Sequence, residues 1–167
     1  IKDLIPFHYP SVKEFKDNKV QIIYLGWFLG DWSYLNNGAI SSLAGLKIRN
    51  DTVVNTGDLY GVSSLDEDWV TLNQMIKYYK FGFGKATEYL NEMIRLGTIT
   101  RDEAVILASK YDGICSDHYI ETFCDYIDIS VEFFWEKVIS STNKNLFTIE
   151  GSKTIKPKFS VGIGEIS

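Results

Sequence analysis

The second half of the chain carries apolar side chains at every third or fourth position, which is the spacing of one face of an α-helix. The stripe from Trp69 to Tyr79 is the clearest case, and a Gly-rich turn separates it from the next one. Thr100 and Glu103 have the spacing of a capping box, which marks the start of a further helix. The pattern predicts successive helices over residues 69–80, 85–96, 101–111, 117–127 and 131–140.

The first third of the chain is less regular. Ser11 opens a second capping-box pattern and predicts a short helix that ends near residue 19. The run Val20–Leu25 is rich in β-branched residues and predicts a buried strand. Asp31 or Ser33 could then cap a helix over residues 34–46, and a largely polar loop follows it.

The predicted elements define an α-rich α/β fold, with a helical bundle from about residue 68 and a small β portion near the start. Short strands are also expected at residues 52–54 and 159–166. Residues 1–140 are expected to form one region, and residues 141–167, which are polar and Lys-rich, a C-terminal tail. Hydrophobic residues make up 45% of the sequence, which is enough to build a core for a chain of this length.

Charge and cysteine content restrict the class of protein. The sequence has 17 Lys and Arg against 22 Asp and Glu, whereas binding to nucleic acid depends on an excess of basic residues, so no nucleic-acid partner is expected. No apolar run reaches the roughly 18 residues of a membrane helix, so we expect a cytoplasmic protein without a membrane partner. Cys115 and Cys124 lie too far apart on a helix for a disulfide. With only two His in the sequence, no metal-ligand cluster can be identified.

The segment Lys-Phe-Gly-Phe-Gly-Lys-Ala-Thr, residues 80–87, is the first candidate site. Gly82 and Gly84 would let the backbone approach a ligand closely, and the helix that follows offers free N–H groups to an anion. Lys80 and Lys85 add positive charge. The segment therefore predicts a phosphate or pyrophosphate site, although it lacks the GxxxxGK[ST] spacing of a Walker loop. The alternative is a helix–helix corner with solvated lysines.

Two further candidates are an acidic turn and an aromatic cluster. The turn Ser63–Asp68, with Asp66 at its centre, could hold Mg²⁺, which prefers one or two carboxylates plus phosphate oxygens. It could equally be an acidic segment favoured by the dipole of the following helix. Trp27, Trp32 and Tyr34 could form an aromatic wall for a sugar ring, or they could pack in the core.

Several motifs follow one another in a specific order. They are Val20–Phe28, Asp31–Ser33, Ser63–Asp66, Lys80–Thr87, Ile94–Arg95, Gly97–Ala104, Lys110–Gly113 and Glu132–Phe134. This succession, over about residues 4–140, resembles the bacterial N-acetyl sugar amidotransferases of lipopolysaccharide and of pseudaminic and legionaminic acid biosynthesis. These enzymes are of the PP-loop ATP pyrophosphatase type. The resemblance implies the helical C-terminal half of such an enzyme, with a nucleotide sugar in its pathway.

The resemblance also implies a reaction. ATP with Mg²⁺ adenylylates the amide oxygen of an acetamido sugar, and pyrophosphate leaves. Ammonia from a glutaminase subunit then displaces AMP, which leaves an acetamidino group on the sugar. Charge develops on the departing pyrophosphate, and positive groups stabilise it.

The resemblance assigns roles to the candidate residues. Lys80 and Lys85 would clamp the pyrophosphate, together with the backbone of the two glycines between them. Asp66 would bind metal or substrate. Trp32 and Tyr34 would contact the sugar. No catalytic residue and no certain metal ligand is identified.

The chain is expected to be a piece of a longer enzyme. It begins with Ile1 rather than Met, and it lacks the Ser-Gly-Gly-x-Asp-Ser loop that holds the ATP phosphates in such enzymes. By itself it is not expected to catalyse the complete reaction. The alternative is a non-catalytic helical module that docks a glutaminase or forms a homodimer. A relative that acts on tRNA is disfavoured by the net charge of −5.

Overall fold

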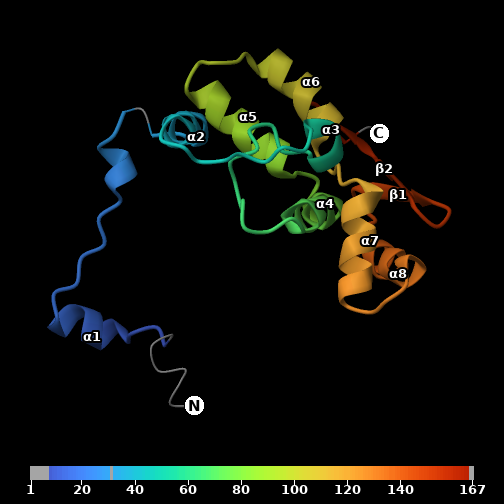
Figure 1. The fold of residues 1–167 in the computed structure, drawn as a ribbon, viewed down its shortest axis with the longest axis horizontal. Coiled ribbons are helices and arrows are strands. Elements are labelled where there is room, and N and C mark those ends of the chain that lie inside the picture. The colour runs from blue at the N-terminus through green and yellow to red at the C-terminus, as the bar shows by residue number, and fades with distance from the viewer. Residues whose placement is uncertain (1–7, 31, 166–167) are drawn as a thin grey trace. The chain divides into compact units, whose positions relative to one another are not determined.

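The structure, a computed structural model, describes residues 8–30 and 32–165 (Figure 1). The chain divides into two compact units, the first ending at Trp32 and the second beginning at Ser33. None of the described helices is long and apolar enough to cross a membrane.

The first unit contains one short helix and one 3₁₀ turn. Helix α1, Val12–Asp17, begins at the predicted capping box of Ser11 and Glu14. The strand expected at residues 20–25 is wrong, because residues 20–24 have no regular secondary structure and Leu25 begins the 3₁₀ turn η2, Leu25–Trp27. Ile22 and Ile23 are each more than 60% exposed. A β-branched run favours a strand only where a neighbouring strand pairs with it, and the described residues place none beside this segment.

The second unit is built from helices followed by two β-hairpins. The helices are α2 Tyr34–Leu43, α3 Val53–Thr56, α4 Val70–Phe81, α5 Lys85–Arg95, α6 Arg101–Tyr111, α7 Asp117–Tyr126 and α8 Val131–Ser141. The strands are β1 Phe147–Glu150, β2 Thr154–Pro157, β3 Phe159–Ser160 and β4 Gly164–Glu165. Both strand pairs are antiparallel, with Ile149 opposite Ile155 in the first and Ser160 opposite Gly164 in the second.

The α-rich class is confirmed, and the five helices predicted from residue 69 onward are present. In the residues that the structure describes, the small β portion lies at the C-terminal end rather than near the start. The strand expected at 52–54 is wrong, because helix α3 occupies that segment and ends at Gly57, whose φ is 67°. The single strand expected at 159–166 is instead the hairpin β3–β4, as far as the chain is described. Asp31, one of the two helix caps considered, lies outside the described residues, and the Ser33 side chain caps α2.

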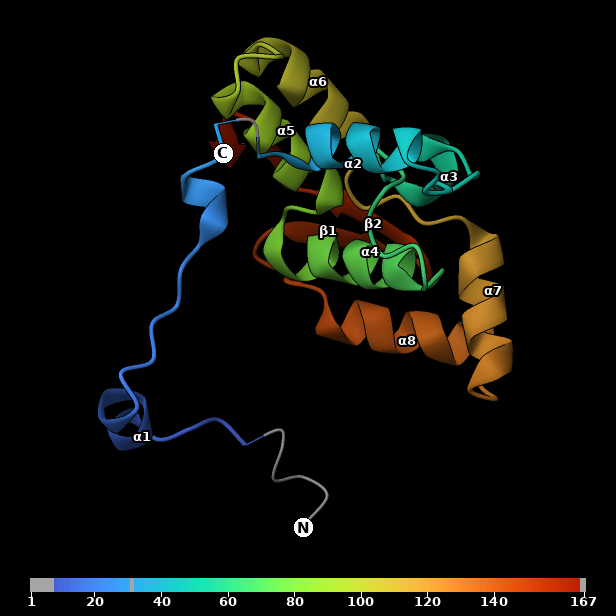
Figure 2. The same cartoon turned by 60° about the vertical axis from the view of Figure 1, so that its left-hand side comes forward.

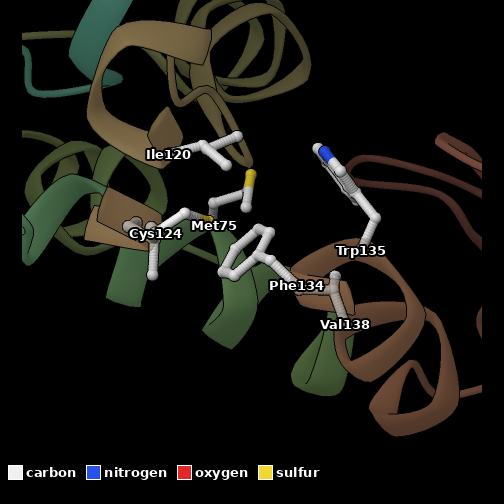
Figure 3. Close-up of a cluster of buried hydrophobic side chains, with 7 residues drawn as sticks. Met75, Ile120, Cys124, Phe134, Trp135 and Val138 are labelled. Atoms are coloured by element: carbon white, nitrogen blue, oxygen red, sulfur yellow. The ribbon is translucent and has the colours of Figure 1, made fainter. Parts of the chain in front are cut away.

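Two groups of buried side chains hold the second unit together. The first lies where α4, α7 and α8 meet, and Figure 3 shows its side chains pointing toward one another. Its members are Leu72, Met75, Ile120, Cys124, Phe134, Trp135 and Val138. The second group joins α5 to α6 through small residues, Ala86, Ala104 and Ala108, together with Leu90. The two views in Figures 1 and 2 show the resulting arrangement, with α5 beside α6 and α4 beside α8.

The segment after α8 is part of the packed structure. Phe147 of β1 is 1% exposed, and its ring packs against the rings of Tyr78 and Tyr79 on α4. Asn143 donates its backbone N–H to the carbonyl of Tyr79 at 3.0 Å. The hairpin β1–β2 therefore covers the C-terminal end of α4, just before the Gly-rich turn.

Gly113, in the turn between α6 and α7, has no room for a side chain. Its φ is 80°, and a Cβ atom there would lie 2.4 Å from the ring of Tyr78. Gly97, between α5 and α6, has a similar φ of 71° and no heavy atom within 4 Å of its Cβ position. A side chain at Gly97 would therefore strain only the backbone, whereas a side chain at Gly113 would also collide with the Tyr78 ring.

We predict that Gly97→Ala costs about 1 kcal/mol of unfolding free energy, because only the left-handed backbone is strained. Gly113→Ala should cost about 1–3 kcal/mol more, because the new methyl group also displaces a packed tyrosine ring. Urea unfolding of the two variants side by side measures the difference. Equal losses would contradict the close contact between Gly113 and Tyr78.

Both cysteines are free thiols, as expected. Burial raises the pKa of Cys115 to about 11, and a nearby Thr71 hydroxyl opposes the rise only in part. Because the thiolate is the reactive form, an upward shift in pKa means less thiolate at any pH below it.

We predict that Cys115 in the folded chain reacts with iodoacetamide at pH 8 about 100-fold more slowly than an ordinary thiol of pKa near 9, since the thiolate fraction falls tenfold per unit. Cys124, which is 1% exposed, should be slower still. Mass spectrometry of timed samples measures the rates, and unfolding in guanidinium should restore ordinary reactivity at both positions. Rapid labelling of Cys115 before unfolding would show that the thiol is not buried as described.

Candidate functional site

The motif Lys80–Thr87 forms the joint between α4 and α5. Helix α4 ends at Gly82, whose φ of 80° stops the helix in a left-handed turn. A Cβ at Gly82 would touch Leu146 and Phe159 at about 3.3–3.5 Å, so the C-terminal segment covers this turn. Gly84 then precedes the first residue of α5 and is itself buried.

Asp112 occupies the N-terminal end of α5. Its carboxylate accepts a hydrogen bond from the backbone N–H of Thr87 at 3.1 Å and a second, short one from the Thr87 hydroxyl. A Cβ at Gly84 would lie 2.9 Å from the same carboxylate. A helix N-terminus favours an anion, and here a side chain of the protein supplies it. A phosphate at this position would have to compete with Asp112.

Lys85 and Lys80, the two lysines of the predicted clamp, lie in different surroundings. The Lys85 ammonium lies over the rings of Tyr34 and Tyr89, at 5.3 and 4.9 Å from their centroids. Lys80 is exposed and lines a groove that runs along α4. The structure thus gives Lys85 aromatic partners and leaves Lys80 without an ion pair among the described residues.

The groove along α4 has a volume of about 680 Å³, within the range of small-molecule sites. It is mostly apolar, and its residues come from the start and exposed face of α4, the Gly-rich turn and α7. They are Glu67, Trp69, Leu72, Asn73, Ile76, Lys77, Lys80, Phe81, Phe83 and Phe123. The Lys77 ammonium makes a short ion pair with Glu88 and lies 4.8 Å from the centroid of the Phe83 ring.

Arg49 organises the acidic turn at one end of this groove. Its guanidinium donates to the carbonyls of Ser64 and Glu67, each at 2.9 Å, and pairs with the Asp68 carboxylate at 2.7 Å. The Arg49 side chain is only 6% exposed. The sequence did not single out Arg49, because an isolated arginine in a polar loop carries no spacing pattern that marks it.

The acidic turn is held in place by Arg49, and a magnesium site there stays a prediction. A guanidinium already binds its carbonyls and the carboxylate of Asp68, while Asp66 is exposed. Within the part of the chain that the structure describes, no group of three His, Cys, Asp or Glu residues could hold a metal ion.

The two residues predicted to contact sugar lie in different units of the chain. Trp32 belongs to the first unit. Tyr34 begins α2, where its backbone N–H donates to Glu92 at 2.9 Å and its ring meets the edge of Tyr89. Tyr89 is fully buried, and burial raises the pKa of its hydroxyl well above the usual range. These contacts attach α2 to α5.

The aromatic groove residues were missed as site residues. Phe81 and Phe83 are 61% and 41% exposed, although both are large apolar residues. Two phenylalanines that alternate with glycines at the end of a helix could have indicated exposed rings, because a tight turn leaves little neighbouring surface to cover them.

No curated protein and no solved structure shows significant similarity to the chain. One protein family does match, over residues 57–158, which is more than half of the chain. The matched range includes the joint, the α4 groove and the hairpin β1–β2, so it extends past the expected boundary at residue 140. Trp32 and Tyr34 lie outside it. By this match, the chain belongs to the family described as LPS biosynthesis protein WbpG-like, C-terminal domain.

Proposed function

We propose that the chain is the C-terminal domain of an ATP-dependent amidotransferase, which converts an acetamido group of a sugar to an acetamidino group during lipopolysaccharide biosynthesis. The observation that carries the proposal is the match to a lipopolysaccharide biosynthesis family over the region where the motifs Lys80–Thr87 and Lys110–Gly113 meet. These are the motifs on which the resemblance to sugar amidotransferases rests.

The reaction proceeds in two balanced steps. The amide oxygen of the sugar attacks the α-phosphorus of ATP, and the bond to pyrophosphate breaks. Ammonia from a glutaminase subunit then adds to the activated carbon, AMP leaves with the former amide oxygen, and a proton is lost. ATP with Mg²⁺ is expected to bind at a Ser-Gly-Gly-x-Asp-Ser loop, a motif that this sequence does not contain.

Lys80 is the residue of this domain best suited to meet an anionic group of the substrates. It lies at the Gly-rich turn, it is exposed, and none of the described carboxylates pairs with it. Lys85 is less available, because leaving its place over Tyr34 and Tyr89 would sacrifice two cation–π contacts. The two lysines of the motif therefore have different roles: Lys80 contacts the ligand, and Lys85 holds α2 on α5.

We predict that Lys80→Ala in the full-length protein lowers kcat about 100-fold, the scale expected when one group that stabilises developing charge is removed. Its thermal unfolding should be unchanged. Release of pyrophosphate and formation of the amidine, measured with ATP, acetamido sugar and ammonium salt, report the activity. A Lys80→Ala enzyme with normal turnover would remove Lys80 from the site.

Lys85→Ala should behave differently from Lys80→Ala. We predict a loss of about 1 kcal/mol in unfolding free energy, because two ring contacts of the ammonium are lost, with turnover reduced mainly through displacement of α2. Lys110→Ala is the matched control, since Lys110 lies 5.0 Å from the ring centroid of Tyr111 and outside the groove. Full stability of Lys85→Ala together with a large loss of kcat would instead support the direct clamp.

A further inference from the structure

The first unit presents a continuous segment of exposed apolar side chains. Among the described side chains of this unit, none is buried. The large apolar residues of the segment are each 52–78% exposed, and they include Val20, Ile22, Ile23, Tyr24, Leu25 and Phe28. Single apolar residues are normal on a protein surface, whereas a contiguous apolar segment marks a place of contact with another molecule.

The backbone of residues 21–24 is available to pair with a strand. These residues have no regular secondary structure, and among the described residues their N–H groups find no backbone acceptor. The run Val20–Leu25 has the β-branched and aromatic composition of a strand. A neighbouring strand would therefore complete both its hydrogen bonds and its packing.

The run carries none of the features that keep exposed strand edges apart. Residues 20–30 contain no Asp, Glu, Lys, Arg or Pro. Soluble proteins use charged residues and prolines to prevent such edges from pairing with other chains. The composition of this segment therefore favours pairing with another chain.

A second copy of the chain is the partner that this segment fits. Two identical strands in antiparallel orientation present the same groups to each other, so the pair is self-complementary. The exposed area is also sufficient. Tyr24 and Phe28 are 69% and 78% exposed, and a buried aromatic side chain covers about 150–250 Å². With the aliphatic side chains of the run, each copy supplies on the order of the 800 Å² that each partner of a stable complex buries.

We propose that the segment Val20–Leu29 is a homodimer interface, in which the runs of two copies pair as antiparallel strands about a twofold axis. Hydrogen bonds between strands are directional, so the axis passes through a pair in which one residue lies opposite its own copy. Pairing of residues 20–24 along their whole length places Ile22 at that position and Val20 opposite Tyr24. The residues after the run add apolar area, because a two-stranded ribbon by itself is only marginally stable.

The first test is the mass of the complete 167-residue chain in solution, measured by light scattering at micromolar concentration. We expect twice the monomer mass of 19.1 kDa. Ile22→Lys should raise the dissociation constant of the dimer about 100-fold, because two buried isoleucines are lost from the centre of the interface. The matched control is Ile106→Lys, since Ile106 on α6 is 66% exposed against 63% for Ile22. This control should dimerise as the parent chain does.

Single cysteines locate the twofold axis without disturbing the apolar segment. Opposite residues of an antiparallel pair have Cα atoms about 4.5–5.5 Å apart, which is within reach of a disulfide. Under mild oxidation, Ile22→Cys should form a disulfide with its own copy. Val20→Cys and Tyr24→Cys should not cross-link separately, but should do so when the two variants are mixed. The parent chain, with its two native thiols, is the control and should stay free of cross-links.

A monomeric parent chain would overturn the proposal and leave the segment to be covered by a different partner. A mass above that of a dimer, an equal loss of dimer in Ile106→Lys, or self-cross-linking at all three cysteine positions would also overturn it. None of these outcomes affects the amidotransferase proposal, which rests on the family match over residues 57–158 and is tested by formation of the amidine.

Discussion

The carboxylate of Asp112 is the contact on which the arrangement of the second unit depends. It holds the first turn of α5 through the backbone and hydroxyl of Thr87, and it comes from the turn that joins α6 to α7. One side chain thus ties the first turn of α5 to the end of α6, through two residues that are 25 apart in sequence. Next to it, Gly84 leaves room for this carboxylate, and Gly113 leaves room for the ring of Tyr78 on α4.

This joint explains why the glycines and Thr87 of the motif need not contact a ligand. Their geometry is accounted for by contacts within the protein, and the positive end of the α5 dipole already faces a carboxylate. What remains of the motif is a free ammonium and two exposed rings, Lys80, Phe81 and Phe83, which the joint presents at one end of the α4 groove. A structural role for the turn and a binding role for its edges are therefore compatible.

The acidic turn at the other end of the groove is likewise held by contacts within the protein while some of its residues line the groove. Arg49 is almost fully buried and binds two carbonyls and one carboxylate. These contacts attach the turn, which carries Glu67 and Trp69 to the rim of the groove. In a lipopolysaccharide biosynthesis domain, this gives the groove one acidic and one basic end.

The sequence by itself determined the helices from residue 70 onward, the capping boxes at Ser11 and Thr100, the free thiols and the motif order that points to the family. These features depend on local spacing, which a single chain segment contains in full. Only the tertiary structure decided the rest. The run at residues 20–25 has strand propensity but no paired strand among the described residues. Asp112 meets Thr87 across helices α5 and α6, and Lys80 and Lys85 have separate neighbours despite their shared motif. Each of these outcomes depends on which residues from distant segments pack together in the fold, and the local sequence pattern does not contain that information.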